Sequence, residues 1–324
     1  MNGPRSYNPQ PPRPIWGIRP PPRKIDSTQL PILTAPLPGR VVIPIQQCLG
    51  MVARPIVTPG QYVKTGEPIA ESIMQAESQT SPKLHASISG KVLAVEEWPA
   101  TGPEPTTETC VVIRSDGLDV PYTGYQNLGE PQNMAPDKIC ELIAEAGIVG
   151  LGGALYSTAA KLQTNNEIHA LILNGAECEP YITCDEMLEL EQPEKVLRGT
   201  RIMMRALKTP LAIIAVESEM AEDRVALHDA IEAAGDKNIR IAVVTAKYPA
   251  GGERQLIQMI MGEEVPEGGN PSDIGYVCHN VATAAAVADF FDTGRPLISR
   301  IVTLGGGGVE APRNVEARIG TLNG

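Results

Sequence analysis

The sequence predicts an α/β chain in which an extended arm and a β-rich domain precede an open parallel sheet with helices on both faces. Residues 39–125 contain short β-type runs between Pro/Gly turns and show no helix signals. From residue 134 onward, strand-like apolar runs alternate with helix-like segments. That alternation is typical of parallel pairing through right-handed crossovers.

Length and composition limit the classes of protein to consider. The chain has 324 residues, 42% of them hydrophobic and 20% charged, so we expect a globular protein with two or three domains. Its net charge of −11 argues against a nucleic-acid partner. Apolar runs are too short to span a membrane, and the first residues do not form a secretory signal. We therefore expect a cytosolic location for the chain itself.

Residues 1–38 contain eleven prolines and no periodic apolar pattern, which predicts an extended arm that wraps over another surface. All charged residues before Asp26 are basic: Arg5, Arg13, Arg19, Arg23 and Lys24. The arm is therefore suited to an anionic membrane surface or an acidic partner, and a solvated tail is the alternative.

Residues 39–125 are expected to form a domain of their own. Strands are predicted at Val41–Ile45, Lys91–Val95 and Cys110–Arg114. Residues 58–70 and 86–93 resemble the two halves of a biotinyl/lipoyl barrel-sandwich hybrid. A carrier domain of that kind presents a modified lysine between the halves, but residues 71–78 contain none. This argues against a swinging-arm carrier.

Residues 134–304 are expected to form a Rossmann-like domain, and residues 305–324 a linker and the start of a further domain. An apolar stripe from Ile139 predicts a helix that starts near Pro136 and ends at Gly147. The later elements, in order, are strand 169–173, helix 193–207, strand 211–216, helix 219–234, strand 239–245, helix 252–261, helix 281–291 and strand 301–304. Ligands of such sheets bind beyond the carboxyl ends of the strands, where residues 174–177 and 248–253 are expected to converge.

Two polar segments carry the chemical signal, a glycine-rich turn at residues 147–153 and Asn-Gly-Ala-Glu-Cys-Glu-Pro at 174–180. The glycines follow a helix rather than a strand, so they are not a standard dinucleotide fingerprint. Taken alone, the glycines fit a helix C-cap and tight turn, and Asn280 fits an N-cap with Thr283 in the first turn. Glu177 and Glu179 taken singly fit a solvated surface. The six cysteines contain no C-x-x-C pair and the four histidines no ligand spacing, so no metal site is predicted.

Four segments occur in one order: 150–161, 174–183, 248–253 and 280–283. In this order they resemble the FMN- and NADH-binding segments of the flavoprotein subunit of respiratory complex I. The chain is more similar to the C subunits of Rnf ferredoxin:NAD oxidoreductase complexes, because residues 16–24 and 37–47 also match that family. The resemblance covers nearly the whole chain.

The resemblance implies a role for each matching residue. The backbone of Gly150, Gly152 and Gly153 would approach the FMN phosphate, with Lys161 adding positive charge. Asn174 and Glu177 would lie along the ribityl chain or the isoalloxazine edge. Tyr248, Gly251 and Glu253 belong to the loop beneath the flavin, and Asn280 and Thr283 resemble phosphate contacts at a helix start. Tyr156 and Glu179 would face the NADH nicotinamide. No general base is required for hydride transfer, so no catalytic residue is assigned.

Three departures from the family pattern stand out. The two cysteine motifs that bind [4Fe-4S] clusters in the family are absent here, and the last residues resemble the start of the family's β-grasp-like domain. The resemblance therefore implies a truncated product. Tyr156-Ser-Thr158 stands where the family often has Phe-Pro-Thr, and Cys48 where it often has His.

The resemblance implies a peripheral electron-transfer subunit of a translocase complex, on the cytoplasmic side of the inner membrane. It would exchange a hydride between NAD(H) and FMN, acting as an NADH:acceptor oxidoreductase. Expected partners are the membrane subunits, a ferredoxin-like subunit and NADH. The alternatives are a docking scaffold with an empty flavin site, which should tolerate changes at Lys161 and Glu177, and a cobalamin-reductase-type flavoprotein.

Overall fold

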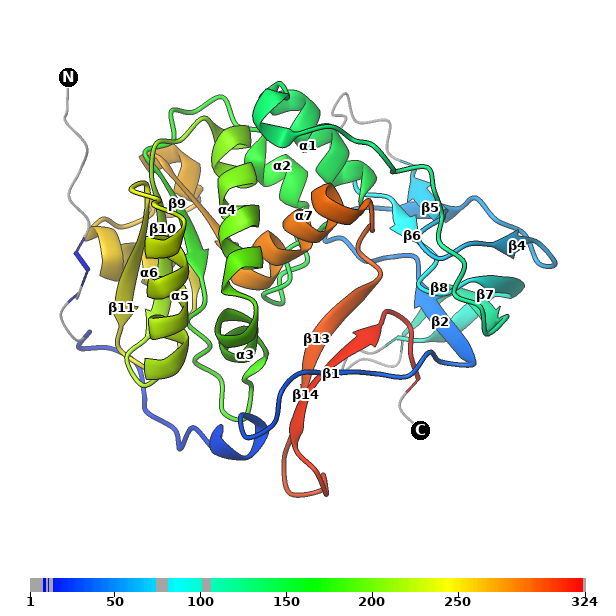
Figure 1. Cartoon of the computed structure of the whole chain (residues 1–324), viewed down its shortest axis with the longest axis horizontal. Coiled ribbons are helices and arrows are strands. Elements are labelled where there is room, and N and C mark those ends of the chain that lie inside the picture. The colour runs from blue at the N-terminus through cyan, green and yellow to red at the C-terminus, as the bar shows by residue number, and fades with distance from the viewer. Residues whose placement is uncertain (1–7, 10, 12–13, 74–80, 101–105, 323–324) are drawn as a thin grey trace. The chain divides into compact units, whose positions relative to one another are not determined.

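The computed structural model describes residues 8–9, 11, 14–73, 81–100 and 106–322 (Figure 1). Contacts divide the chain into two compact units. The first comprises Met1–Leu33, Leu162–Ala288 and Ile301–Val315, and the second comprises Thr34–Lys161, Asp289–Arg300 and Glu316–Gly324. These units differ from the predicted domain boundaries. The helix predicted to open the Rossmann-like domain, α1 (Pro136–Glu145), lies in the second unit, where Glu145 pairs with Lys83 at 2.6 Å.

The second unit is built on two antiparallel sheets, with strand orders β2-β8-β7-β4 and β3-β5-β6. Their bounds are β2 Arg40–Pro44, β3 Ala53–Pro55, β4 Tyr62–Val63, β5 Pro68–Ser72, β6 Leu84–His85, β7 Gly90–Pro99 and β8 Thr107–Ser115. Aliphatic side chains from both sheets form one buried core, which includes Val41, Ile43, Ile69 and Ile113 together with Ile88 from the β6–β7 connection. The predicted barrel-sandwich is thus confirmed. Of the segment without a carrier lysine, residues 74–78 lie outside the described residues.

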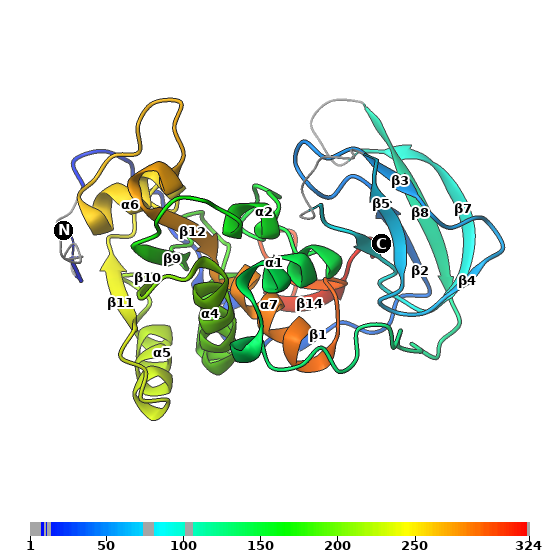
Figure 2. The same ribbon diagram turned by 90° about the horizontal axis from the view of Figure 1, so that it is seen from above.

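The first unit contains a parallel four-stranded sheet in the order β11-β10-β9-β12. Its strands are β9 Ala170–Asn174, β10 Ala212–Glu217, β11 Ile239–Val244 and β12 Tyr276–Asn280. Helix α6 (Glu253–Met261) packs on one face, where Leu256 and Ile257 join the core around Ile172 and Ile213. Helices α4 (Pro193–Leu207) and α5 (Ala221–Ala233) cover the opposite face (Figure 2). The predicted open sheet with helices on both faces is confirmed.

The sequence analysis does not predict strand β12, helices α2 (Thr158–Leu162) and α3 (Cys184–Glu191), or the 3-10 helix Pro271–Ile274. Strand β12 runs into α7 (Val281–Thr293) without a turn residue between them, so the sequence has no boundary signal there. Helix α3 spans eight residues, and four of them are acidic. Short polar helices depend on tertiary contacts for their stability, and sequence patterns detect them poorly.

The described part of the N-terminal arm runs along the first unit, as predicted. Asn8 donates its backbone N–H to Ile260 O at 3.1 Å, and Val243 donates to Pro9 O at 2.9 Å. Farther along, Ile18 and Tyr248 form an antiparallel bridge. Of the five basic residues in the arm, Arg5 and Arg13 lie outside the described residues. Backbone hydrogen bonds at residues 8, 9 and 18 therefore hold this part of the arm.

A third sheet has the order β1-β14-β13, with β1 Leu33–Thr34, β13 Ser299–Leu304 and β14 Arg313–Arg318. Residues 305–312, which include the four consecutive glycines, connect β13 to β14. Within the described residues, the helices are all too short or too polar to cross a bilayer.

Candidate functional site

The carboxyl ends of β9 and β12 meet at the switch point of the parallel sheet. Strand β10 lies on one side of β9 and β12 on the other, so the crossovers on the two sides diverge. Asn174 ends β9, Asn280 ends β12, and the two residues are paired in register. The Asn280 side-chain amide donates to Asn174 O at 3.3 Å. Two predicted site residues thus lie together where open α/β sheets bind their ligands.

The loop after β9 is tied to the loop after β11. The Asn174 amide donates to Gly251 O at 2.8 Å, and the Gly251 backbone N–H donates to Cys178 Sγ at 3.4 Å. A Cβ atom at Gly251 would lie 2.5 Å from Ala176 O, so only glycine fits there. The loop after β11 also contains the exposed Tyr248, and it ends where α6 starts at Glu253. The predicted residues Asn174, Gly251, Tyr248 and Glu253 are therefore neighbours.

Glu177 is buried, and its carboxylate lies at the N-terminus of α3. It accepts hydrogen bonds from the backbone N–H groups of Asp185 at 3.2 Å and Glu186 at 3.4 Å, and from Cys184 Sγ at 3.2 Å. A helix N-terminus stabilises a carboxylate in this position. The solvated-surface interpretation of Glu177 is therefore wrong, whereas Glu179 is exposed.

Glu177, Cys184 and Asp185 also bring atoms that could ligate a metal ion, two carboxylate oxygens and a sulfur, within 4.8 Å of one another. Each of the three already has hydrogen-bond partners, and the Asp185 carboxylate accepts from Asn280 at 2.5 Å. These protein contacts account for the grouping without a metal ion.

Asn280 also starts helix α7. Its Oδ1 accepts the backbone N–H of Ala282 at 2.8 Å, so the N-cap interpretation is confirmed. Thr283, in the first turn of α7, is fully buried. A phosphate contact by Asn280 or Thr283 stays a prediction.

The glycine loop forms a small hairpin in the second unit. Val149 and Ser157 form a bridge, and Gly150 donates its N–H to Tyr156 O at 2.8 Å. Gly152 and Gly153 are exposed, and a Cβ at Gly153 would meet no atom within 4 Å. The backbone of this loop is thus open to an approaching anion. Tyr156 belongs to the hairpin and is exposed, and Lys161 lies in α2.

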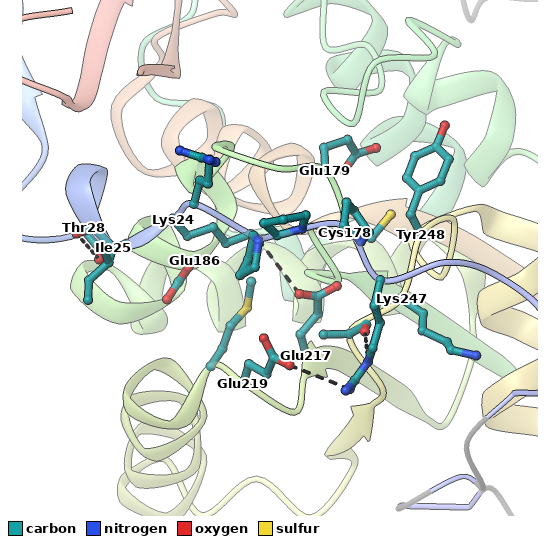
Figure 3. A pocket seen from close by; sticks show the side chains of 17 residues that line it. Lys24, Ile25, Thr28, Cys178, Glu179, Glu186, Glu217, Glu219, Lys247 and Tyr248 are labelled. Atoms are coloured by element: carbon teal, nitrogen blue, oxygen red, sulfur yellow. Dashed lines mark hydrogen bonds and ion pairs between the residues drawn. The ribbon is translucent and has the colours of Figure 1, made fainter. Parts of the chain in front are cut away.

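A cavity of about 730 Å³ lies in the first unit, and the arm forms part of its lining (Figure 3). Cys178, Glu179 and Tyr248 contribute from the two loops described above. The sequence prediction had not assigned a site role to the other charged lining residues, which are Arg19, Arg23, Lys24, Glu186, Glu217, Glu219 and Lys247. The sequence contains one signal for Glu217, because this residue, like Asn174, ends a parallel strand.

Lys24 is the cation that reaches the buried acids of this cavity. Its Nζ lies 3.9 Å from the Glu217 carboxylate, and Figure 3 draws this ion pair as a dashed line. The same Nζ donates to the backbone carbonyl of Glu177. Burial raises the pKa of Glu217 to about 7, although Lys24 opposes the rise. Burial also raises the pKa of Glu186 and brings the pKa of the Cys178 thiol to about 11. The Cys178 thiol is therefore protonated and unreactive at neutral pH.

Behind the loop, Glu189 of α3 and Asp223 of α5 form a buried acid pair. Both are almost fully buried, and a Cβ at Gly175 would lie 2.2 Å from a Glu189 carboxylate oxygen. Burial and the neighbouring acid raise the pKa of Glu189 well above its usual range, and burial raises that of Asp223 to about 7. At neutral pH the pair therefore retains a proton.

This pair predicts a pH-dependent stability. The folded state binds more protons than the unfolded state between the unfolded pKa, about 4, and the folded value of about 7 for Asp223. The free energy of unfolding therefore falls as pH rises through this range. Glu189→Gln keeps the shape and a hydrogen-bond donor, so it should raise the free energy of unfolding at pH 8 by about 2 kcal/mol. Urea unfolding of the wild type and the variant at pH 5 and pH 8 measures the difference in their free energies of unfolding.

The exposed Glu267 provides the control for that experiment. Glu267→Gln should leave both the stability and its pH dependence unchanged. A Glu189→Gln variant that is less stable than the wild type at pH 8 would contradict the assignment.

Two family profiles match the chain. Residues 15–118 match the RnfC barrel sandwich hybrid domain, and residues 143–289 match the Nuo51 FMN-binding domain. The second match contains all the predicted site residues. Among solved structures, a chain of an NAD+-reducing [NiFe]-hydrogenase in the air-oxidized state superimposes with a TM-score of 0.51 at 26% identity. That alignment covers 60% of this chain and 40% of the other.

Curated relatives match over most of the chain. The C subunit of the ion-translocating oxidoreductase complex of Pseudomonas aeruginosa is 43% identical over 94% of this chain and 39% of its own length. The C subunit of the Na(+)-translocating ferredoxin:NAD(+) oxidoreductase complex of Acetobacterium woodii is 39% identical over 94% of this chain and 67% of its own length. The chain thus spans well under half of the first relative and two thirds of the second. With this similarity along both domains, the chain belongs to the RnfC family, the C subunits of ion-translocating oxidoreductase complexes.

Proposed function

We propose that this chain is a peripheral NAD(H)- and FMN-binding electron-transfer subunit of a membrane ferredoxin:NAD+ oxidoreductase complex. One observation carries the proposal: hydrogen bonds join Asn174 to both Asn280 and Gly251 at the switch point of a parallel sheet. The segment that contains them matches an FMN-binding profile. The exposed glycine loop offers backbone that can approach a phosphate.

When bound, FMN would supply the conversion between a two-electron hydride and single electrons. The chain's own residues would bind and orient the reactants. We assign the phosphate to the exposed backbone of Gly152 and Gly153 and to Lys161. Gly150 would support this loop instead, because its N–H is already donated to Tyr156 O. Separately, we assign the ribityl and ring edges to the loops that carry Asn174 and Gly251, with Tyr248 and Glu253 beside them.

For NADH, the exposed Tyr156 and Glu179 remain the proposed contacts. The buried Glu177 would act by shaping its loop.

The partners and the location that we propose are those expected for the RnfC family. Membrane subunits and a ferredoxin-like subunit would be the partners, on the cytoplasmic side of the inner membrane. The [4Fe-4S] clusters expected from the family would lie outside this chain, because the sequence lacks their cysteine motifs.

A flavin titration tests the proposal. The purified chain, reconstituted with FMN, should retain a visible flavin spectrum that bleaches with one equivalent of NADH under anaerobic conditions. Lys161→Met removes a cation proposed to face the phosphate, so the FMN dissociation constant should rise about tenfold. The exposed Lys237, in the α5–β11 turn, provides the matched control Lys237→Met.

Lys161 is a better test position than Glu177 for separating a flavoprotein from a scaffold. Because the Glu177 carboxylate supports the start of α3, its replacement would perturb either kind of protein. A wild-type chain that retains no FMN would overturn the flavoprotein proposal and favour the docking scaffold.

A further inference from the structure

The N-terminal arm contacts the carboxylate loop, residues 174–183, at three successive points. The backbone N–H of Tyr181 donates to Pro22 O at 2.8 Å. Lys24 Nζ donates to the backbone carbonyl of Glu177. Ser27 Oγ lies 2.9 Å from Thr183 Oγ1, and both residues are buried. The arm therefore holds the loop near its middle and at its end.

The Ser27–Thr183 contact belongs to a buried polar cluster. The side-chain amide of Asn314, a fully buried residue, donates to Ser27 O at 3.0 Å and to Thr183 Oγ1 at 2.8 Å. Thr303 Oγ1 accepts the Thr183 backbone N–H at 3.0 Å and donates to Asn314 Oδ1 at 2.7 Å. Buried networks whose members are all satisfied fix the geometry of the segments that they join.

Lys24 differs from the other contacts because it carries charge. It is mostly buried and faces Glu217 at the end of β10, with Glu177 and Glu186 close enough to influence the same groups. A neighbouring carboxylate lowers the free-energy cost of burying an ammonium group, so Glu217 stabilises the position from which Lys24 donates to the Glu177 carbonyl.

We propose that arm residues Pro22–Ser27 form a clamp on the carboxylate loop and that Lys24 is a positioning residue for the flavin site. This proposal rests on the proposed function and deepens it. Lys24 acts through the Glu177 carbonyl and the Glu217 carboxylate, so it does not itself need to contact the cofactor. The sheet fixes Asn174 at the start of this loop, and the clamp would fix the residues that follow, from Glu177 to Thr183. The arm would thus complete a site whose family signature lies more than 120 residues downstream.

The first test needs no cofactor. Amide hydrogen exchange of the peptide that covers residues 174–183 should be faster in Lys24→Met than in the wild type, and unchanged in Lys237→Met. Lys24→Arg retains a charged donor, so it should restore most of the protection. Equal exchange in Lys24→Met and the wild type would overturn the clamp. If Lys24→Met does not fold, Ser27→Ala makes the same comparison with a smaller deletion.

The second test measures the effect on the cofactor. Lys24→Met should raise the FMN dissociation constant about tenfold at pH 8, and Lys24→Arg should stay within about threefold of the wild type. If Lys24→Met shows faster amide hydrogen exchange in the loop but an unchanged FMN dissociation constant, the positioning role is overturned. A wild type that binds no FMN would instead overturn the proposed function and the positioning role with it, while the exchange experiment still decides the clamp.

A pH profile separates positioning from general stability. The groups that face Glu217 are Lys24 from the arm, Glu177 and Glu179 from the loop, and Glu219 from the β10–α5 connection. Protonation of Glu217 below about pH 7 removes the partner of Lys24, so wild-type affinity for FMN should fall between pH 8 and pH 6. The FMN phosphate titrates in every variant, so the profile is compared with that of Glu217→Gln. Identical profiles for the two proteins would overturn the role of this ion pair.

Discussion

Gly199→Ala is expected to lower the free energy of unfolding by about 3 kcal/mol, at the upper end of typical overpacking effects. Gly199 lies in α4, and a Cβ atom there would be 1.7 Å from the backbone oxygen of Ala284 in α7. No side-chain rotation relieves a contact with backbone, so the two helices would have to move apart. The better helix propensity of alanine offsets only about 1 kcal/mol.

Urea unfolding followed by circular dichroism measures this loss. Gly308→Ala is the matched control, because a Cβ there would meet no atom within 4 Å and its φ lies outside the left-handed region. A Gly199→Ala variant as stable as the control would show that α4 and α7 do not approach as closely as described.

Gly251→Ala is expected to weaken FMN binding about a hundredfold, equivalent to about 3 kcal/mol. The added methyl group would lie 2.5 Å from Ala176 O and 3.2 Å from Cys178 Sγ. It would therefore push the loop after β11 away from the loop after β9 and break the hydrogen bonds that Gly251 makes to Asn174 and Cys178. Because both loops belong to the proposed site, the binding geometry would be lost even if the sheet stayed intact.

Fluorescence titration with FMN measures the effect, and the neighbouring glycine gives the control. A Cβ at Gly252 would first meet the Gln255 side chain, which can rotate away, so Gly252→Ala should weaken binding much less. Equal losses for the two variants would indicate a general disturbance of the α6 N-terminus rather than a specific contact between the loops.

Periodicity and boundary signals located most of the long elements. The helix predicted over 193–207 coincides with α4, and the strand predicted over 239–245 matches β11 to within one residue. These segments have strong apolar patterns, and a proline starts α4, so local sequence was sufficient. The same reasoning missed β12 and α3, which owe their stability to a parallel neighbour and to the Glu177 carboxylate.

The sequence by itself determined the order of the site segments, because four short motifs and their spacing identify the family whatever their contacts. It also determined that the motifs at 174–177 and 248–253 share one sheet edge, since both directly follow strands. The tertiary structure alone decided which side chains hold the loops and which face solvent. Glu177 and Glu179 are two residues apart, yet the first caps a helix and the second is exposed.

The role of the arm was likewise visible only in the structure. Lys24 and Glu217 are separated by 193 residues, and no local pattern links a proline-rich arm to the end of a buried strand. The carboxylate of Glu217 is buried at the end of β10, where an opposite charge lowers the cost of burial, and Lys24 of the arm provides that charge. Local periodicity encodes elements and their order, whereas burial and long-range pairing decide the chemistry of individual side chains.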